Sequence, residues 1–271
     1  MTPTKSYPYA VVNVFTTEPL SGNSWAVFRD ASEFDTETMQ KIARELNLIE
    51  TAFVLPATRP DCAARVRIFT PTKETPFAGH PTVGTAFVLL EKRIVSRSCH
   101  EFPLEEEFGP IPLRIEAGAP PLIWLHTPAI HEGRCLDGSL CARVKDKAAV
   151  DRAWLDLSGL RSLKDMESES FCVFVFNPSS HGAYSRMFAP EYDIPEDPAT
   201  GSSTGPLAVF MMRRGSISNA AGTRFVSEQG TKMGRRSLLH VDIQGENGTD
   251  GIYIGGQVTP IIEAVMTLNA G

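Results

Sequence analysis

An internal repeat constrains this chain more than any other feature of its sequence. The pattern Arg-x-Phe-x-Pro occurs at 67–71 and again at 186–190. Each copy leads through an acidic, proline-containing loop to a glycine, Gly79 or Gly201, and then to an apolar run of helical character. The same alignment, with three extra loop residues in the second copy, pairs Thr82 with Thr204 and Ala86 with Ala208. A repeat this long is not a solenoid unit, so it predicts two similar domains, each with a strand, a glycine loop and a buried helix.

Each glycine loop is predicted to open a helix. The N-terminus of a helix presents unpaired backbone N–H groups and a partial positive charge, so it can bind an anion. Two such N-termini facing each other across an interdomain cleft would hold a carboxylate and orient the carbon beside it. For either loop taken alone, simple capping of the helix by Gly, Ser and Thr is the alternative. A phosphate loop is not indicated, because the sequence has no GxxxxGK[ST] motif and no GxGxxG after a strand.

Composition excludes several classes of protein. The 271 residues carry a formal net charge of -6, and basic pairs such as Arg213-Arg214 are isolated, so nucleic-acid binding is not expected. No apolar run reaches the roughly 18 residues that span a bilayer, and no signal peptide is recognisable at residues 1–10. Five scattered cysteines without a CxxC pair fit a reducing compartment, so we expect a cytoplasmic protein with no membrane partner.

A short stretch contains four residue types that can bind metals. These are His126, His131, Cys135 and Cys141. Their spacing matches no zinc pattern, and the stretch is typical of irregular loop and strand, so no metal site is predicted.

The first third of the chain alternates strands with a helix. Strands are predicted at 11–15, 25–28 and 48–55. The helix between the last two is capped by Asp35 or Thr36 and stops at Asn47. This alternation indicates an α/β or α+β fold.

Three ionisable residues lie where catalysis would need them. Glu50 interrupts an otherwise apolar or hydroxylic segment, and a half-buried carboxylate with a raised pKa can act as acid and base near neutral pH. His80 follows Gly79 at the first helix start, and Asp197 precedes the second glycine loop. The structural alternatives are an exposed strand position for Glu50, a capping or packed histidine for His80, and a loop cap for Asp197.

Several motifs together resemble one known family. They are Val14-Phe15-Thr16, Pro19-Leu20, Gly22-Asn23, residues 42–47, Glu50-Thr51, residues 67–84 and 186–205, Glu228-Gln229-Gly230, Met233-Gly234-Arg235 and Gly255-Gly256-Gln257-Val258. On these residues, from about Tyr9 to Ile262, the chain is similar to the phenazine-biosynthesis PhzF-like family.

The resemblance implies a diaminopimelate-epimerase-like fold with two pseudo-symmetric domains, each wrapping strands round a central helix. We expect an N-terminal domain of residues 1–125 plus 257–271 and a C-terminal domain of residues 126–256. The active site would lie in the cleft between them. The last strand, 258–268, would return to the first domain.

The resemblance also implies roles for individual residues. Glu50 would be the proton shuttle, with His80 and Asp197 assisting proton transfer or polarising a small carboxylate substrate. The residues expected to bind that substrate are Asn23, Gly79, Gly201, Ser202 and Gln229. Family members are commonly homodimers and need no metal or organic cofactor. We therefore predict a cofactor-independent isomerase or epimerase.

Racemases of the wider superfamily use two opposed cysteines, and the glycine loops would place them at Ala78 and Thr200. Neither is a cysteine, so a two-thiol racemase is not predicted. A single carboxylate instead implies that Glu50 moves a proton between two carbons on one face of the substrate. The family prototype does this on trans-2,3-dihydro-3-hydroxyanthranilate.

Three departures from the family pattern bear on the substrate. Ile49 replaces a common serine beside the catalytic glutamate, which removes a hydroxyl. Ser24 replaces a common proline. The stretch between Pro128 and Leu140 is short, which would alter a lid or open the cleft.

Two other functions fit the same scaffold. A lyase or dehydratase would abstract the proton beside the carboxylate and then expel a β-hydroxyl group. A non-catalytic binding protein would be stabilised by its ligand and would exchange no proton with it, since fold alone does not fix function.

Overall fold

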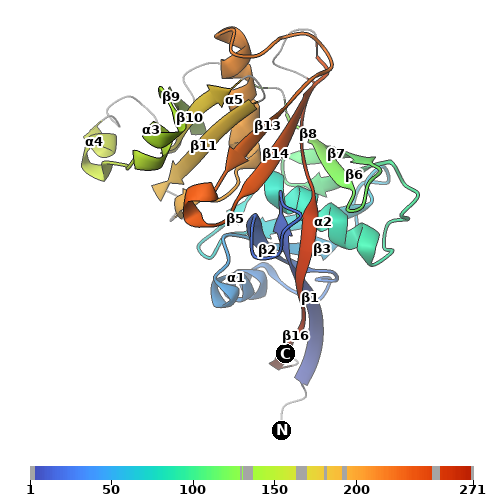
Figure 1. Cartoon of the computed structure of the whole chain (residues 1–271). Coiled ribbons are helices and arrows are strands. Elements are labelled where there is room, and N and C mark those ends of the chain that lie inside the picture. Colours follow the sequence, from blue (N-terminus) through green and yellow to red (C-terminus); the bar gives the residue numbers. More distant parts are fainter. Residues whose placement is uncertain are drawn as a thin grey trace. The chain divides into compact units, whose positions relative to one another are not determined.

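The computed structural model describes residues 4–128, 130, 137–162, 170–179, 182–190, 194–245 and 251–269. The chain divides into two compact units (Figure 1). Unit 1 comprises Met1–His126 with Gly255–Gly271, and unit 2 comprises Thr127–Ile254.

Within its described residues, unit 1 contains two helices and strands from both ends of the chain. Its elements are β1 (Thr4–Val14), β2 (Asn23–Phe28), α1 (Thr36–Leu46), β3 (Thr51–Leu55), β4 (Ala64–Phe69), β5 (Glu74–Thr75), α2 (Gly79–Glu91), β6 (Glu101–Glu106), β7 (Gly109–Glu116), β8 (Leu122–His126) and β16 (Val258–Asn269). The strand order is β16-β1-β2-β3-β4-β6-β7-β8, with β5 paired to β4.

Unit 2 has a matching set of elements. They are β9 (Asp137–Arg143), α3 (Lys147–Arg152), α4 (Leu157–Ser162), β10 (Ser170–Ser179), β11 (Gly182–Ala189), β12 (Ile194–Asp197), α5 (Gly201–Arg213), β13 (Thr223–Gln229), a short 3-10 helix (Thr231–Met233), β14 (Ser237–Ile243) and β15 (Ile252–Gly256). The strand order is β15-β14-β13-β11-β10-β9, with β12 paired to β11.

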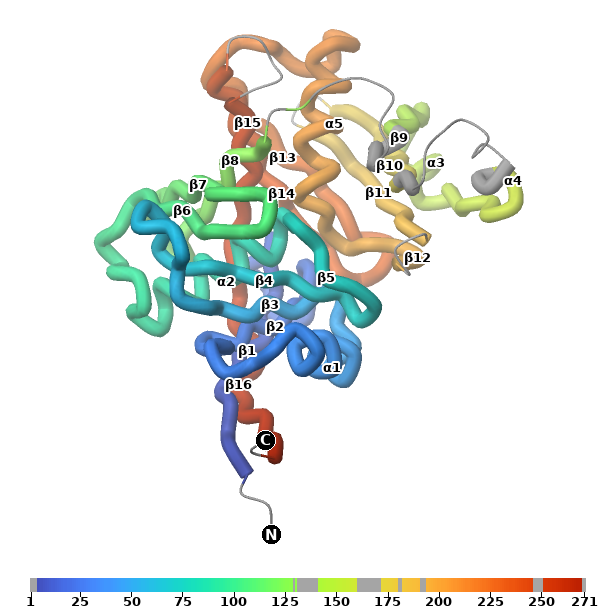
Figure 2. Tube along the Cα trace, turned by 180° about the vertical axis from the view of Figure 1, so that it is seen from behind, coloured from blue at the N-terminus to red at the C-terminus, as the bar shows by residue number. Residues whose placement is uncertain are grey.

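The two units share one topology, which Figure 2 lets the reader follow along the chain. In unit 1, β2 is parallel to β3, β3 antiparallel to β4, β4 parallel to β6, and β6 antiparallel to β7. In unit 2 the same sequence of directions runs through β9, β10, β11, β13 and β14. The fold predicted from the sequence repeat, two pseudo-symmetric domains of mixed α/β structure, is confirmed.

A buried helix forms the centre of each unit. Residues 79–90 of α2 are all buried, and α2 contacts β16, β1 and β8, which lie at opposite ends of the unit 1 strand order. Helix α5 contacts β9 and β14 in unit 2. A helix that is apolar on all sides needs such a wrapping of strands, which is why both runs lack the usual polar face. Within the described parts of the chain, no helix is long and apolar enough to cross a membrane.

Helix α1 follows its sequence signals closely. The Asp35 carboxylate accepts a hydrogen bond from the Thr38 backbone N–H at 2.8 Å, and Asn47 ends the helix in the left-handed region with φ of 49°. The predicted strand at 48–55 is shorter in the structure, because β3 begins only at Thr51. The chain turns from the end of α1 into β3 over residues 48–50. Glu50 therefore precedes the strand instead of lying within it.

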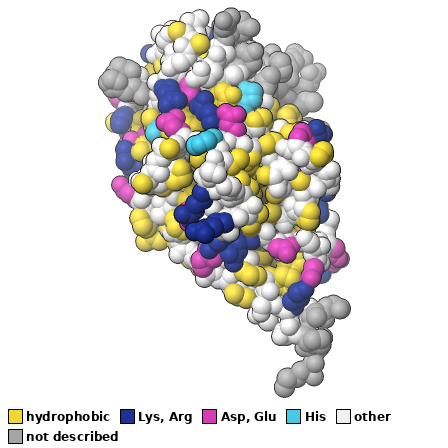
Figure 3. All heavy atoms as spheres, turned by 90° about the vertical axis from the view of Figure 1, so that its right-hand side faces the viewer, with side chains coloured by type: hydrophobic (Ala, Val, Ile, Leu, Met, Phe, Trp, Pro, Cys, Tyr) yellow, Lys and Arg dark blue, Asp and Glu magenta, His cyan; other side chains and the backbone are white. Residues whose placement is uncertain are grey.

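The last strand, β16, pairs antiparallel with β1, as expected for a C-terminal strand that returns to the first domain. It ends the strand order of unit 1, and its Ile262 and Val265 side chains are 49% and 59% exposed. Figure 3 shows one face of the chain, on which hydrophobic side chains lie exposed between basic and acidic ones.

Candidate active site

Unit 1 brings Glu50 and His80 into direct contact. Glu50 stands immediately before β3, and His80 is the second residue of α2. The His80 Nε2 atom lies 3.1 Å from the Glu50 Oε2 atom, and the two side chains are only 7% and 11% exposed. The helix start and the strand start thus bring an imidazole close to a buried carboxyl group, although these two atoms are not aligned for a hydrogen bond.

The charge state of His80 is set by its burial. Burial lowers the pKa of His80 from its ordinary 6.5 to about 3, so the imidazole is neutral at physiological pH. A neutral imidazole has one N–H donor and one acceptor nitrogen. His80 can therefore donate to an ionised Glu50, or accept from a protonated Glu50 in its other tautomer. The contact suits a carboxyl group that gains and loses a proton.

The residues packed against His80 are apolar and lie close to it. The Trp25 ring meets the His80 ring edge-on, with centroids 6.0 Å apart, and Trp25 has no exposed surface. A side chain at Gly84, one helical turn after His80, would place its Cβ atom 2.8 Å from Trp25 Nε1. Glycine at this position therefore lets the helix approach Trp25 closely and fixes the imidazole.

Asn23 is fully buried at the start of β2. Gly22 before it has φ of +68°, and a Cβ atom there would lie 2.4 Å from the Val14 carbonyl oxygen, so only glycine fits this turn. Ser24, which replaces the proline common in the family, donates a hydrogen bond to Asn13 Oδ1 at 2.7 Å. The departure at Ser24 is thus accommodated by a cross-strand contact between β1 and β2.

Unit 2 holds Asp197 in a hydrogen-bonded loop before α5. The Thr200 hydroxyl donates to Asp197 Oδ2 at 2.5 Å, and the Ala199 N–H donates to Oδ1 at 3.4 Å. Gln229, buried on β13, donates from Nε2 to the Asp197 carbonyl oxygen at 2.7 Å and accepts from the Thr200 N–H at 3.2 Å. Gln229 therefore joins the loop to the helix start, which is a structural role in addition to any contact with substrate.

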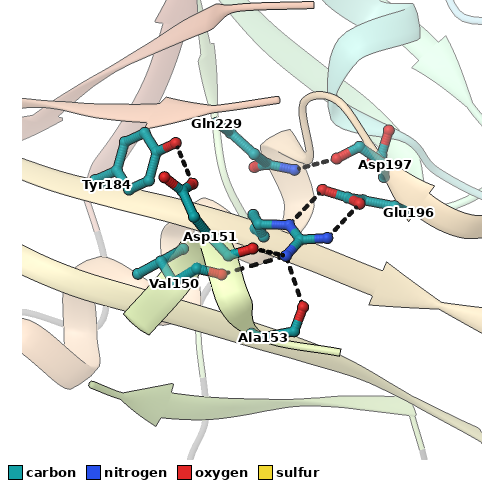
Figure 4. A network of polar contacts seen from close by, with 8 residues as sticks. Val150, Asp151, Ala153, Tyr184, Glu196, Asp197 and Gln229 are labelled. Atoms are coloured by element: carbon teal, nitrogen blue, oxygen red, sulfur yellow. Dashed lines mark hydrogen bonds and ion pairs between the residues drawn. The ribbon is translucent and has the colours of Figure 1, made fainter. Parts of the chain in front are cut away.

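An arginine fixes the strand that carries Asp197 (Figure 4). Arg186 donates to both carboxylate oxygens of Glu196 at 2.8 Å, and Glu196 immediately precedes Asp197. The Nη1 atom of Arg186 donates to three backbone carbonyl oxygens at the end of α3. These belong to Val150, Asp151 and Ala153, at 3.2, 3.2 and 2.7 Å. From β11, the guanidinium group thus ties the end of α3 to β12.

Neither central helix has an acidic residue in its first turn, and the residue before each helix makes no side-chain cap of its own. Gly79 and Gly201 are buried first residues, whereas Ser202 is exposed. A helix start of this kind keeps its partial positive charge available for an anion. Each unit can therefore offer backbone N–H groups to a negatively charged ligand.

Sequence reasoning missed one group that belongs to this arrangement. Glu106 is the buried last residue of β6. The distance between its Oε1 atom and the Oγ1 atom of Thr82, on α2, is 2.5 Å. The signal was present in the repeat: Glu105-Glu106 in the first copy corresponds to Glu228-Gln229 in the second. The match is weak in the sequence because it lies beyond the helices, where the two copies share few other residues.

Two of the four potential metal-binding residues of the sequence, His131 and Cys135, lie outside the described residues. Among the residues that are described, no three His, Cys, Asp or Glu side chains gather as a metal site would require.

A model of the family described as phenazine biosynthesis-like protein matches the chain twice, over residues 12–135 and 130–264. Among curated proteins, the trans-2,3-dihydro-3-hydroxyanthranilate isomerase of Pseudomonas aeruginosa is 33% identical over 88% of this chain and 90% of its own length.

Solved structures agree with these matches. A Bacillus anthracis phenazine biosynthesis protein of the PhzF family superposes with a TM-score of 0.82 at 21% identity, over 97% of this chain and 99% of the other, which shows the shared fold. A predicted epimerase of Pseudomonas aeruginosa superposes with a TM-score of 0.74 at 28% identity, over 96% and 99%.

Proposed function

The chain belongs to the phenazine biosynthesis-like family of isomerases, and from this premise we propose that it moves a proton within a small carboxylate substrate, with Glu50 as the proton carrier. The observation that carries the proposal is the buried contact between Glu50 and the neutral His80. The two atoms lie 3.1 Å apart without hydrogen-bond alignment, so a small rotation of either side chain would give the carboxyl group a partner in both of its protonation states.

The proposed reaction has two proton transfers. The Glu50 carboxylate takes a proton from one substrate carbon, and the electron pair of that C–H bond is delocalised through the adjacent unsaturated system. The protonated Glu50 then returns the proton to a second carbon on the same face. Nothing is gained or lost overall, so the product is an isomer and no redox cofactor or metal ion is required by the balance.

We propose that the helix starts hold the substrate carboxylate. The backbone N–H groups of Gly79 and Gly201 and the exposed hydroxyl of Ser202 would supply the hydrogen bonds. Asp197, Asn23 and Gln229 complete the proposed set. Because Asp197 is already bound by Thr200 and Ala199, its proposed part is to polarise or orient the substrate.

The first substrate to test is that of the Pseudomonas aeruginosa relative, trans-2,3-dihydro-3-hydroxyanthranilate. Ile49, half-buried beside Glu50, offers no hydroxyl to an amino or hydroxy group of that substrate. We therefore propose a related carboxylate with a less polar ring as the preferred substrate, and the panel described below should contain both kinds.

We also propose a cytoplasmic homodimer. Cys62, Cys99 and Cys141 are free thiols in the described part of the chain, which supports a reducing compartment. The end strand β16 offers its backbone groups and the exposed Ile262 and Val265 side chains to a second copy. Light scattering should give twice the chain mass, and Val265→Lys should lower it.

The deciding experiment is proton NMR in D2O with a panel of unsaturated and hydroxylated small carboxylates. The wild-type protein should place deuterium on a substrate carbon, and Glu50→Gln should not. A matched control is Asp242→Asn, which removes the charge of a fully buried carboxylate in unit 2 that is paired with Arg224 at 3.0 Å. That variant should still exchange deuterium.

The outcomes separate the alternatives. Deuterium on the carbon with an isomeric product supports the proposed isomerase. Loss of water with a new conjugated chromophore identifies a lyase on the same scaffold. Binding without exchange by a folded wild-type protein identifies a binding protein, and turnover by Glu50→Gln removes Glu50 from the mechanism.

A further inference from the structure

Glu106 is the buried carboxyl group of unit 1 that the proposed reaction leaves unused. It is the last residue of β6 and is only 4% exposed. Its Oε1 atom lies 2.5 Å from the Oγ1 atom of Thr82, in the first turns of α2. Glu106 therefore touches the same helix start that carries Gly79 and His80.

The number of available protons indicates the state of this carboxyl group. The Thr82 hydroxyl also lies 2.7 Å from the Ala78 carbonyl oxygen, which can only accept. Thr82 has a single hydroxyl proton, and it cannot be donated fully to both partners. If Thr82 donates to Ala78, the proton in the contact with Glu106 must come from the carboxyl group. Both short contacts are satisfied together only when Glu106 is neutral.

The surroundings of Glu106 favour the neutral form as well. Burial raises the pKa of Glu106 to about 8, and the hydrogen bonds that Thr82 and the Ala78 N–H would donate to the ionised form only partly oppose the shift. Neighbouring charges are directed elsewhere: Arg65 of β4 stands opposite Glu105, whose carboxylate accepts from the Thr58 and Arg59 backbone N–H groups. His80, on the same helix turn, is neutral.

The second unit contains the amide counterpart of this carboxyl group. Arg65 stands opposite Glu105 in unit 1, and Tyr184 stands opposite Glu228 in unit 2, so Glu106 and Gln229 occupy equivalent strand positions. Gln229 is neutral and accepts a hydrogen bond from the N–H of Thr200, the residue that precedes α5. Ala78 is the equivalent residue before α2.

We propose that Glu106 is a positioning residue whose neutral carboxyl group holds the start of α2, as the Gln229 amide holds the start of α5. Neutrality has a consequence for the site. An ionised Glu106 would cancel the partial positive charge of the helix start and repel an anionic substrate, whereas the neutral acid leaves that charge available. This consequence rests on the proposed function, but the state of Glu106 does not.

The first test measures the carboxyl group directly. Carbon-13 NMR of protein labelled at glutamate carboxyl carbons is recorded as a function of pH, and the Glu106 signal is identified by its absence in Glu106→Gln, or in Glu106→Asp should the first variant not fold. We expect a titration midpoint above about pH 6, whereas an ordinary glutamate titrates near 4.3. A midpoint below about pH 6 would overturn the proposal.

The second test asks whether the charge of Glu106 affects anion binding. Affinity for anthranilate, an aromatic carboxylate that the proposed chemistry cannot turn over, is measured between pH 6 and pH 9 in wild type and in Glu106→Gln. Wild-type affinity should fall severalfold above about pH 8, and the fall should be absent in the variant. An equal fall in both proteins would refute the role of Glu106 at the helix start.

The two tests keep the inference distinct from the proposed function. If wild-type protein fails to bind anthranilate and exchanges no deuterium with the panel, the proposed function fails. The carboxyl titration still decides whether Glu106 is neutral, because it needs no substrate.

Discussion

The starts of α2 and α5 are built on one scaffold but carry different side chains. An arginine on the preceding strand holds a glutamate on the next short strand in both: Arg67 with Glu74, and Arg186 with Glu196. The Thr82 and Thr204 hydroxyls each bond the carbonyl oxygen four residues earlier, at 2.7 and 2.8 Å. At the second helical position, however, unit 1 has the buried His80 and unit 2 the exposed Ser202. The arginine–glutamate pair and the threonine bond are thus the same at both helix starts, whereas the residue at the second helical position differs.

The two arginines make the same ion pair but differ in the other groups to which they donate hydrogen bonds. Arg186 uses its remaining donors on three carbonyl oxygens at the end of α3 and is 10% exposed. Arg67 instead reaches the Thr36 hydroxyl at the start of α1, at 3.0 Å, and is 18% exposed. The same pair is therefore more deeply integrated in unit 2.

The largest expected effect is on the rate of proton transfer, and it should differ between variants of unit 1 and of unit 2. We expect Glu50→Gln to lower proton transfer by about 10⁴-fold and His80→Ser, which copies the unit 2 residue, by about 10²-fold. Ser202→Ala removes one hydroxyl and should cost less than tenfold. Deuterium exchange rates on the best substrate measure all three. A larger loss for Ser202→Ala than for His80→Ser would reverse the assignment of catalysis to unit 1.

The second effect separates the two arginines. Arg186→Ala leaves the Glu196 carboxylate and three carbonyl oxygens without a partner, and should cost about 3–5 kcal/mol of the free energy of unfolding. Arg67→Ala removes fewer buried contacts and should cost about 1–2 kcal/mol. Urea denaturation of both variants at one pH gives the comparison, and equal losses would contradict the deeper integration of Arg186.

The third effect concerns the acid and the amide at the equivalent strand positions. The pKa of Glu106 is about 8 in the folded chain and 4.5 ordinarily, so unfolding releases a proton between these pH values. Stability from Glu106 is therefore complete below pH 4.5 and is lost as pH rises to 8, by up to about 1.4 kcal/mol per unit.

Glu106→Gln should remove this dependence, so its stability gain over wild type should be near zero at pH 4.5 and reach about 3 kcal/mol at pH 7. His80 contributes the opposite slope between pH 3 and 6.5, because its lowered pKa makes unfolding take up a proton there. The difference between variant and wild type isolates Glu106. A difference that does not change with pH would show that Glu106 is not protonated in the fold.

The smallest effect is expected at the paired threonines. Thr82→Val removes the partner of a buried acid and should cost about 1–2 kcal/mol, because the Glu106 proton is left unbonded. Thr204→Val removes one hydroxyl bond to the Thr200 carbonyl oxygen and should cost about 0.5–1 kcal/mol. Thermal unfolding of the two variants tests the order, and a costlier Thr204→Val would argue against a special environment at Thr82.

Much of the local structure could be predicted because its signals are local. Asp35 and Asn47 bracket α1 through a side-chain cap and a left-handed turn, and both signals act within a few residues. The boundary before Thr51 was missed, because the connection from α1 to β3 is set by where the sheet lies and not by the apolar character of Leu48 and Ile49.

The sequence by itself determined that the chain has two similar halves with a buried helix in each, because apolar periodicity and a repeated glycine loop are properties of short segments. It also selected Glu50 and His80 as candidates. Only the tertiary structure decided that these two lie in contact, that His80 is neutral, and that Glu106 lies against Thr82 of α2. Burial and proton sharing depend on atoms brought together from distant segments, so no local pattern could report them.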